Sequence, residues 1–305
     1  MRQEPGVAND FFIFRFSDTP GANPTLRNAS RIEYNFLDVM LGYSWDWGSI
    51  SLGKGNTTYG HERNGNIIIS DRPSSYPNLR LDIKPLDWLS FNYLHGWLNS
   101  NIVDTSAAYS TFRYRGNENT DRQVYIQKYL AIHSITVEPY KNLTFSFGES
   151  VIYKGEPKYQ FLIPIVPFSI LGGYIGNEEK SNKFNTQFFM SLSSKNHIPN
   201  THLYLNYLID EFSATSVYDS LIDYSKYALS MGASIVDIPI NNLTLDLEYT
   251  KVFPSTYQHF NPALTYASFG FLNSYAYTLG HWAGDNTEII YGSLNYRIIR
   301  GLDFT

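Results

Sequence analysis

The sequence predicts an all-β fold, namely a transmembrane antiparallel β-barrel of the bacterial outer-membrane type. Three observations support this prediction. Apolar and polar residues alternate with a period of two, short and long connections follow each other in turn, and aromatic residues make up 16 % of a chain whose mean hydropathy is slightly negative. In such barrels one side of each strand faces lipid and the other faces a polar interior, so the two sets of residues cancel in any average.

The clearest hairpin lies in residues 78–97. Its first arm alternates apolar and polar residues from Leu79 to Ile83, a turn follows at residues 84–87, and the alternation resumes from Leu89 to Trp97. Period-two alternation on both sides of a proline-containing turn is typical of a β-hairpin. One face of this hairpin is apolar and aromatic, and we expect it to face lipid. The other face is small, polar or charged, and we expect it to line a water-filled lumen.

The same turn pattern recurs along the chain. Each copy has a proline, a few turn residues and a leucine that begins a new alternating strand. The copies begin at Pro139, Pro199 and Pro239, with Ile298 in the proline position of a further copy and a weaker first copy at residues 43–54. Proline and asparagine favour turn geometry, which explains this punctuation. With further strands at residues 11–16 and 31–41, we expect roughly 12 or more strands in a single β-barrel domain over residues 1–305.

Longer polar stretches separate these turns. They lie at residues 53–76, 99–122, 153–183, 210–225 and 251–285. Short turns on the periplasmic side and long loops on the extracellular side are typical of outer-membrane barrels. The start of the sequence lacks the pattern of a secretory signal, and the sequence stops inside a predicted strand. We therefore expect the barrel to be partial, without its signal segment, early strands and closing strands.

The composition argues against several classes of function. The chain has no cysteine, which excludes disulfides and thiolate chemistry, and its net charge of −5 without a basic patch argues against nucleic acid as a partner. No apolar run is long enough for a membrane-spanning helix. The seven histidines lack metal-ligand spacing and no nucleophile elbow is present, so we predict no metal, no cofactor and no catalytic residue.

Charged residues fall on the face that we assign to the lumen. They are the acids Asp82, Asp246 and Glu248, with Arg80 and Arg297 as possible partners. Paired carboxylates are the general acid and base of glycoside hydrolysis, but a barrel interior needs a polar and charged lining in any case. We therefore interpret these five residues as a lumen charge network.

A second group of residues on the long-loop side combines aromatic rings with imidazoles and a carboxylate. Its members are Tyr153, Tyr159, Tyr257, His259, His281, Trp282 and Asp285. Sugar rings stack on aromatic faces and carboxylates bind sugar hydroxyls, so this set is a candidate polysaccharide-binding site. An aromatic girdle at the membrane interface has a similar composition, and both interpretations remain open here.

Several short stretches resemble, in the same order, the Wzi-type capsule-assembly outer-membrane proteins in the form found in Bacteroidetes-like bacteria. These stretches are residues 53–55 with 66–70, 79–81 before Pro85 and Trp88, His133 before the Pro139 turn, 149–153, 204–212, 247–250 with 257–259, and 279–286. Together they extend over about residues 35–305, and the last two are the most specific. The signal peptide, early strands, N-terminal helical element and closing strands of the family are not found in this sequence.

The resemblance implies a monomeric outer-membrane barrel whose lumen is plugged by loops and side chains. It also implies a lectin-like, non-catalytic protein that anchors capsular or extracellular polysaccharide at the cell surface, with outer-membrane lipid as its other partner. It supplies no ligand contacts residue by residue. The barrel pattern alone leaves an outer-membrane porin or solute channel as the alternative function.

Overall fold

The computed structural model describes residues 23–28, 31–35, 37–112, 119–174, 184–211, 226–269, 276–300 and 302–305. Most of these residues form one antiparallel sheet of twelve strands, in the order β18-β17-β14-β13-β12-β11-β10-β9-β6-β5-β4-β3. Each strand pairs with the strands next to it in this order, which makes the sheet a continuous meander. The all-β antiparallel fold and the predicted strand number are therefore confirmed.

The strands of this sheet are β3 (Val39–Trp45), β4 (Gly48–Gly55), β5 (Tyr76–Leu86), β6 (Leu89–Val103), β9 (Tyr125–Tyr140), β10 (Leu143–Lys154), β11 (Phe184–Lys195), β12 (Thr201–Glu211), β13 (Lys226–Val236), β14 (Leu243–Val252), β17 (Thr287–Ile299) and β18 (Leu302–Phe304). Three two-stranded pairs lie outside it: β1 (Asn23–Asn28) with β2 (Arg31–Asn35), β7 (Tyr109–Phe112) with β8 (Asn119–Arg122), and β15 (Ala267–Phe269) with β16 (Ala276–Thr278). The helical elements are η1 (Tyr159–Leu162), α2 (Phe168–Tyr174) and η3 (Pro262–Leu264).

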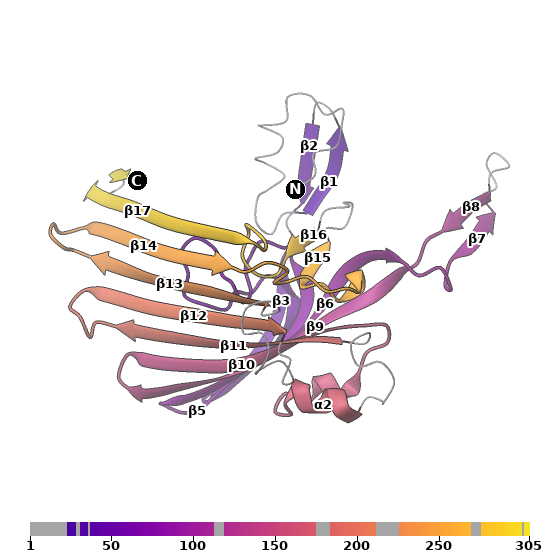
Figure 1. Ribbon diagram of the computed structural model, residues 1–305, viewed down its shortest axis with the longest axis horizontal. Helices are drawn as coiled ribbons and strands as arrows, with labels where there is room; N and C mark the ends of the chain where they lie inside the picture. The colour runs from indigo at the N-terminus through magenta and orange to yellow at the C-terminus, as the bar shows by residue number, and fades with distance from the viewer. Residues whose placement is uncertain are drawn as a thin grey trace.

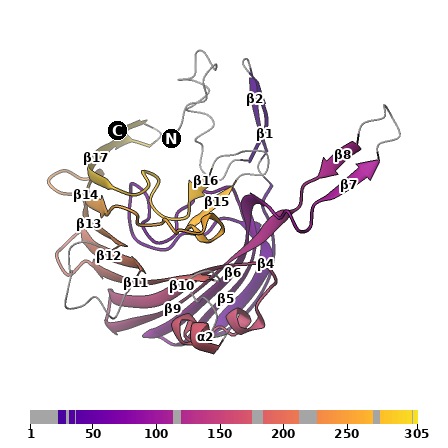
Figure 2. The ribbon, with the colours of Figure 1, turned by 45° about the vertical axis from the view of Figure 1, so that its right-hand side comes forward.

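The sheet curves around a central space to form the wall of a barrel (Figures 1 and 2). Among the described residues its two edge strands, β3 and β18, are not paired with each other, so the wall is not closed. No helix in the described ranges is long and apolar enough to cross a membrane.

Six tight hairpins join strands at one end of the wall, which we name the short-turn end; the opposite end is the long-loop end. The turns predicted at Pro139, Pro199, Pro239 and Ile298 all lie between paired strands. One predicted turn is shifted, because β5 continues through Pro85 with an irregular register after Ile83 and the chain reverses only at residues 87–88. The strand predicted at residues 31–41 is divided into β2 and β3, and that at residues 11–16 lies outside the described residues.

The hydrophobic core lies inside the wall. Ile67, Ile68 and Ile69 are buried there against apolar side chains of the wall such as Leu130 and Ile152. Two of the connections that we expected as extracellular loops fold back into the barrel and supply this core, through residues 56–75, 253–269 and 276–286. The expectation of a water-filled lumen is therefore wrong at this level, because a run of three isoleucines is strongly favoured away from water.

A second apolar cluster lies on the outer side of the wall. Residues 155–174, with η1 and α2, cover the outer faces of β6, β9 and β10, and we name this segment the outer cover (Figure 1). Phe161 and Phe168 of the cover are buried against tyrosines of the wall, among them Tyr153. The sequence pattern predicts an extracellular loop here, whereas the structure has a segment packed along the barrel.

The outer cover also satisfies polar groups on this face. The Glu149 carboxylate accepts hydrogen bonds from the backbone nitrogen and the hydroxyl of Ser169, both at 3.1 Å. His133 donates through Nδ1 to the carbonyl of Pro164 at 2.7 Å, and its ring stacks on Phe168. Buried charged groups need such partners, so the cover and these wall residues depend on each other.

Replacing Glu149 with alanine is expected to loosen the outer cover. Loss of a charged acceptor leaves the Ser169 N–H without its partner, at a cost of about 1.5–3 kcal/mol, which raises the opening of the segment about tenfold or more. Limited trypsin cleavage after Lys158 measures this opening. Asp87→Ala, at an exposed turn of the other end, is the matched control. Equal cleavage rates of Glu149→Ala and wild type would show that this carboxylate does not hold the cover.

Candidate functional site

The two inward connections form one unit, which we name the plug: residues 56–75, 253–269 and 276–286. Two parallel tyrosine rings, Tyr257 and Tyr266, join its segments, with ring centroids 5.8 Å apart. The Tyr257 hydroxyl donates to the Ile67 carbonyl at 2.8 Å, and the Tyr266 hydroxyl donates to the Ile68 carbonyl at 3.0 Å. The backbone polar groups of the buried isoleucine run are thus paired inside the barrel, as burial requires.

Buried charges of the wall hold the plug. Asp210 on β12 accepts from the Tyr257 backbone nitrogen at 2.7 Å and from the Gln187 side chain at 2.9 Å. Lys128 on β9 is fully buried and donates to the carbonyls of Thr265 and Ala267, each at 2.6 Å. These ion-to-dipole hydrogen bonds are stronger than neutral ones, so they fix the height of the plug within the wall.

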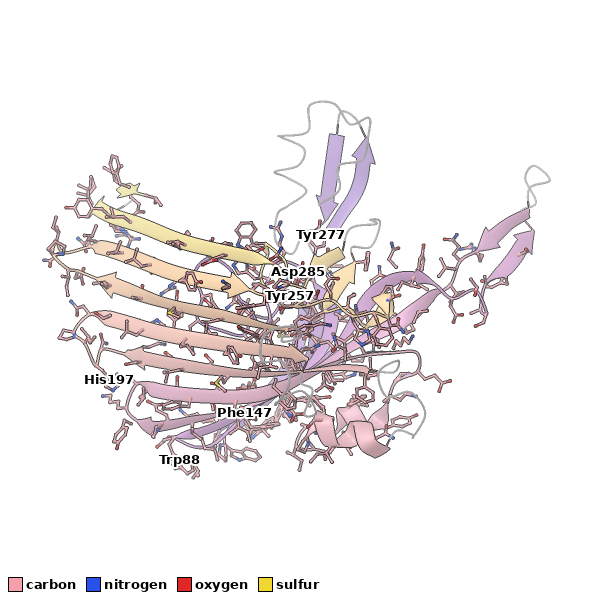
Figure 3. The ribbon with its side chains drawn as sticks, viewed as in Figure 1. Trp88, Phe147, His197, Tyr257, Tyr277 and Asp285 are labelled. Carbon is pink, nitrogen blue, oxygen red and sulfur yellow. The ribbon has the colours of Figure 1, made fainter. Side chains whose placement is uncertain are left out.

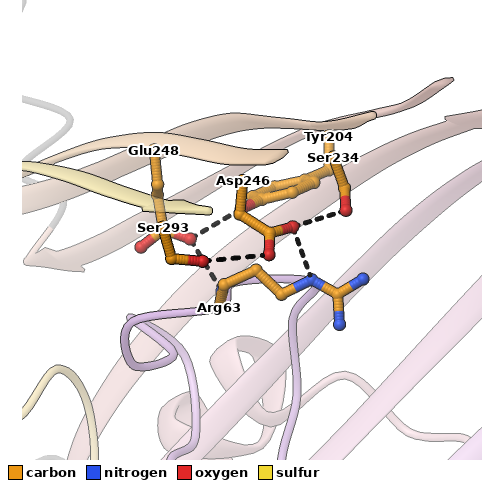
Figure 4. Close-up of polar contacts among 6 residues, drawn as sticks. All are labelled: Arg63, Tyr204, Ser234, Asp246, Glu248 and Ser293. Carbon is orange, nitrogen blue, oxygen red and sulfur yellow. Dashed lines mark hydrogen bonds and ion pairs between the residues drawn. The ribbon is translucent and has the colours of Figure 1, made fainter. Parts of the chain in front are cut away.

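Glu248 connects β14 to the other segment of the plug (Figure 4). Its Oε2 accepts from the Tyr204 hydroxyl at 2.6 Å and from the Arg63 backbone nitrogen at 2.7 Å. Gly232 on the intervening strand β13 makes this possible, because a Cβ there would lie 2.3 Å from the Tyr204 hydroxyl oxygen. The absence of a side chain at residue 232 therefore allows the phenol to reach across to Glu248.

Asp246, two residues earlier on the same face, is also engaged (Figure 4). It accepts from the Ser234 hydroxyl and from the Ser293 hydroxyl at 3.3 Å, and it pairs with Arg63 Nε at 3.6 Å. The two acids of the predicted lumen network thus lie together, and both contact Arg63 of the plug, Asp246 through the guanidinium and Glu248 through the backbone nitrogen. Sequence reasoning missed Arg63 because it placed residues 53–76 outside the barrel.

The other three members of the predicted charge network lie elsewhere. Asp82 accepts from the Asn92 side chain at 2.7 Å, and Arg80 lies two residues before it on the same strand. Arg297 pairs with Asp303 at 2.8 Å, near the hairpin that joins β17 to β18 at the short-turn end. The five residues therefore do not form a single network.

A polar pocket of about 500 Å³ lies between the plug and the short-turn end of the wall. The plug contributes His61, Glu62 and Arg63, and the wall contributes Lys195, Asn200 and His202. Sequence analysis singled out none of these six residues. No motif marks them, because the pocket exists only where a long connection turns back against the β11–β12 hairpin.

Two groups of the plug beside this pocket have shifted pKa values. Burial, together with the neighbouring His202, Lys195 and Arg63, lowers the pKa of His61 to about 4, so the ring is neutral at pH 7. Burial raises the pKa of Glu62 to about 7, against the opposing effect of hydrogen bonds. These bonds come from the Ile67 backbone nitrogen at 3.2 Å and the Asn66 side chain at 3.0 Å. Gly60 has a φ of +125°, and a Cβ there would lie 2.1 Å from Glu62 Oε2.

The predicted polysaccharide-binding residues do not share one surface. Tyr153, Tyr257 and His281 are buried, the first under the outer cover and the other two in the plug, so their rings pack inside the protein. In Figure 3, Tyr257 and Asp285 lie toward the long-loop end, opposite Trp88 and His197. For the three buried rings, the expectation of an exposed stacking surface is wrong, because period-two alternation does not reveal which segment covers each face.

The other four residues remain at least partly accessible. Tyr159 is 80 % exposed on the outer cover, and Trp282 is 47 % exposed, with its indole nitrogen donating to the Asn64 carbonyl at 2.6 Å. Asp285 accepts from the Ser255 backbone nitrogen at 2.9 Å, and the His259 ring contacts that of Phe260. Trp282 thus combines an accessible ring with a fixed orientation, which favours stacking.

Comparison with known proteins identifies a solved structure with a similar fold. No protein-family model and no curated protein matches the sequence. Among solved structures, the chain is similar to Wzi, an outer-membrane protein involved in group 1 capsule assembly in Escherichia coli and a carbohydrate-binding β-barrel. The TM-score is 0.53 at 13 % sequence identity, over 88 % of this chain and 54 % of the Wzi chain. This similarity supports a Wzi-like β-barrel fold, and the chain spans about half the length of that protein.

Protonation of Glu62 is expected to hold the plug more tightly at pH 5 than at pH 8, whereas His61, whose lowered pKa has the opposite effect, offsets part of this gain. The Glu62 pKa of about 7 in the folded protein lies above its ordinary value of 4.5, so the folded state binds the proton more strongly. The resulting stabilisation is complete below the ordinary value and is lost as the pH rises through 7. Hydrogen exchange of residues 60–69, corrected for intrinsic rates, measures it. The difference between wild type and Glu62→Gln across this pH range isolates the Glu62 contribution, because His61 is common to both proteins; a difference that does not change with pH would assign the effect to another group.

Proposed function

We propose that this protein is a non-catalytic, carbohydrate-binding β-barrel of the bacterial outer membrane that holds capsular or extracellular polysaccharide at the cell surface. The observation that carries the proposal is the filled interior. A barrel wall whose centre is a hydrogen-bonded, apolar plug has a rigid surface to offer a polymer, and in the described residues the plug fills space that a solute path would need. The structural similarity to Wzi, which is itself a carbohydrate-binding barrel, is the second support.

The outer surface of the wall supports a place in a membrane. Many large apolar side chains are exposed on this outer surface, among them Leu41, Phe147, Met190, Leu247 and Ile290. Soluble monomers rarely expose contiguous apolar area of this kind. Exposed aromatic residues near the short-turn end, including Trp47, Trp88 and Tyr140, match the girdle that barrels place at a membrane interface.

The engagement of the interior acids favours binding over catalysis. Glu248 is buried, with Oε2 occupied by a phenol and a backbone nitrogen, and Asp246 is occupied by two hydroxyls and a guanidinium. A general acid or base must reach the atom whose proton it transfers. Here these carboxylates hold the plug, and a reaction would have to release them from it.

Polymer binding needs no single strong site. A capsular polysaccharide repeats the same units many times, so weak contacts on neighbouring protein molecules add to a high effective concentration. The exposed ring of Trp282, fixed by the Asn64 carbonyl, offers one such contact without a large ordering cost.

Deletion of the gene in its host is expected to shift polysaccharide from the cell surface into the medium without changing its total amount. Complementation with Trp282→Ala should restore about a tenth to a half of the attachment, since one aromatic contact contributes about 0.5–1.5 kcal/mol. Trp88→Ala is the matched control, because Trp88 is similarly exposed (51 %) but lies at the short-turn end. The attached and released fractions are measured as sugar. No shift on deletion would refute the anchor.

The alternative function, a porin or solute channel, is tested by conductance. A barrel filled by the plug is expected to stay silent in planar lipid bilayers. Stepwise conductance of the purified full-length protein at ordinary voltages would contradict a static plug and favour the channel. Glu248→Ala, which removes the acceptor for the Arg63 backbone nitrogen, is expected to loosen the plug and raise the frequency of conductance events above that of wild type.

A further inference from the structure

The polar pocket beside the plug has no part in the function proposed above. Its volume of about 500 Å³ falls in the range of small-ligand sites, about 300–1,000 Å³. It lies between residues 58–66 of the plug and the wall segments that flank the β11–β12 and β13–β14 turns, so it belongs to the short-turn end. A ligand there would be reached from the side opposite to the long loops.

One corner of this pocket is made of rings. His61 and His202 meet edge to face with centroids 5.6 Å apart, and the Tyr204 ring lies 5.4 Å from that of His202. His202 is held by Ser193, whose hydroxyl lies 2.8 Å from Nε2. Tyr204 is held by its bond to Glu248. The buried Tyr204 ring thus supports His202 without lining the pocket, and the two imidazoles of the lining supply rings against which a pyranose can pack.

The lining also contains amide side chains. Asn196 and Asn200 stand in the turn between β11 and β12, both with positive φ, at 61° and 59°. Asparagine adopts this conformation more readily than most residues. The Asn196 backbone nitrogen donates to the Thr201 carbonyl at 2.8 Å, which closes the turn. Each amide side chain offers both donors and acceptors, the complement that sugar hydroxyls require.

The charged groups in the lining favour an anion. Lys195 and Arg63 line the pocket, and 51 % of the Arg63 side chain remains exposed although its Nε pairs with Asp246. The one acid in the lining, Glu62, is already bonded to Asn66 and the Ile67 backbone. Lys195 and Arg63 are also among the groups that lower the pKa of His61, after burial and His202.

We propose that this pocket binds a single carboxylate-bearing sugar residue, a uronate, with its ring against His61 and His202 and its carboxylate toward Lys195 and Arg63. The assignment of the ligand as a saccharide rests on the proposed function. The presence of a carboxylate on the ligand and the location of the site at the short-turn end are inferred from the pocket alone. A polymer held at the long-loop end and a uronate held here would occupy different sites.

The test uses the purified full-length protein in detergent micelles and titrations followed by saturation-transfer NMR. D-Glucuronic acid, D-glucose and inorganic phosphate are the three probes. We expect glucuronate to bind about tenfold more tightly than glucose, as one charge-assisted contact predicts. Lys195→Gln should remove most of this difference. Lys251→Gln, which deletes an equal charge from a residue paired with Glu288 outside the pocket, should leave it unchanged.

Each other outcome overturns part of the proposal. Equal binding of glucuronate and glucose would refute the proposed recognition of the carboxylate. An unchanged preference for glucuronate in Lys195→Gln would refute it as well. Phosphate binding as tight as that of glucuronate would show an anion site without sugar recognition. If cells lose polysaccharide on gene deletion but the protein binds no glucuronate, the anchor stands and the pocket assignment falls. If the protein binds glucuronate but gene deletion releases no polymer, the pocket assignment stands and the anchor function falls.

Discussion

The burial of Ile67, Ile68 and Ile69 inside the curved sheet is the constraint on which the rest of the structure depends. Each such side chain gains about 1.5–3 kcal/mol when it leaves water. This gain is available only if the facing wall is apolar at the same height, as it is at Leu130 and Ile152. It also requires hydrogen-bond partners for the backbone of the run. The hydroxyls of two plug tyrosines donate to the carbonyls of Ile67 and Ile68. An open, water-filled lumen is incompatible with this arrangement.

The polar residues of the wall follow from the same constraint. Asp210, Lys128 and Glu248 are buried ionisable residues, and such groups are tolerated only with several good hydrogen bonds. Their partners are backbone atoms of the plug, which ties one loop conformation to one strand register. A slip of one residue in β12 or β14 would turn these side chains to the outer face. The register of the wall and the position of the plug are therefore set together.

Local signals explain why much of the fold could be predicted from the sequence. The turns at Pro139, Pro199 and Pro239 are encoded within a few residues, and alternation assigns the two faces of each strand. The candidate site was harder, because alternation does not say which distant segment will cover a face. Tyr153 was expected to be accessible, yet the outer cover buries it, and Arg63 was overlooked, although it is the cation that meets Asp246. Contacts between residues almost two hundred positions apart leave no local pattern.

Two binding surfaces proposed here share one short piece of backbone. Arg63 lines the polar pocket, and its nitrogen is fixed by Glu248; the next residue, Asn64, holds the indole of Trp282 through its carbonyl. Preorganised groups of this kind bind without the cost of ordering loops. Binding at one surface can affect binding at the other only if this segment has a second conformation that one of the two ligands favours. Residues 63–64 are held by hydrogen bonds to both Glu248 and Trp282, so we interpret both binding surfaces as rigid. Because the pKa of the neighbouring Glu62 is raised to about 7, the stability of this segment depends on pH.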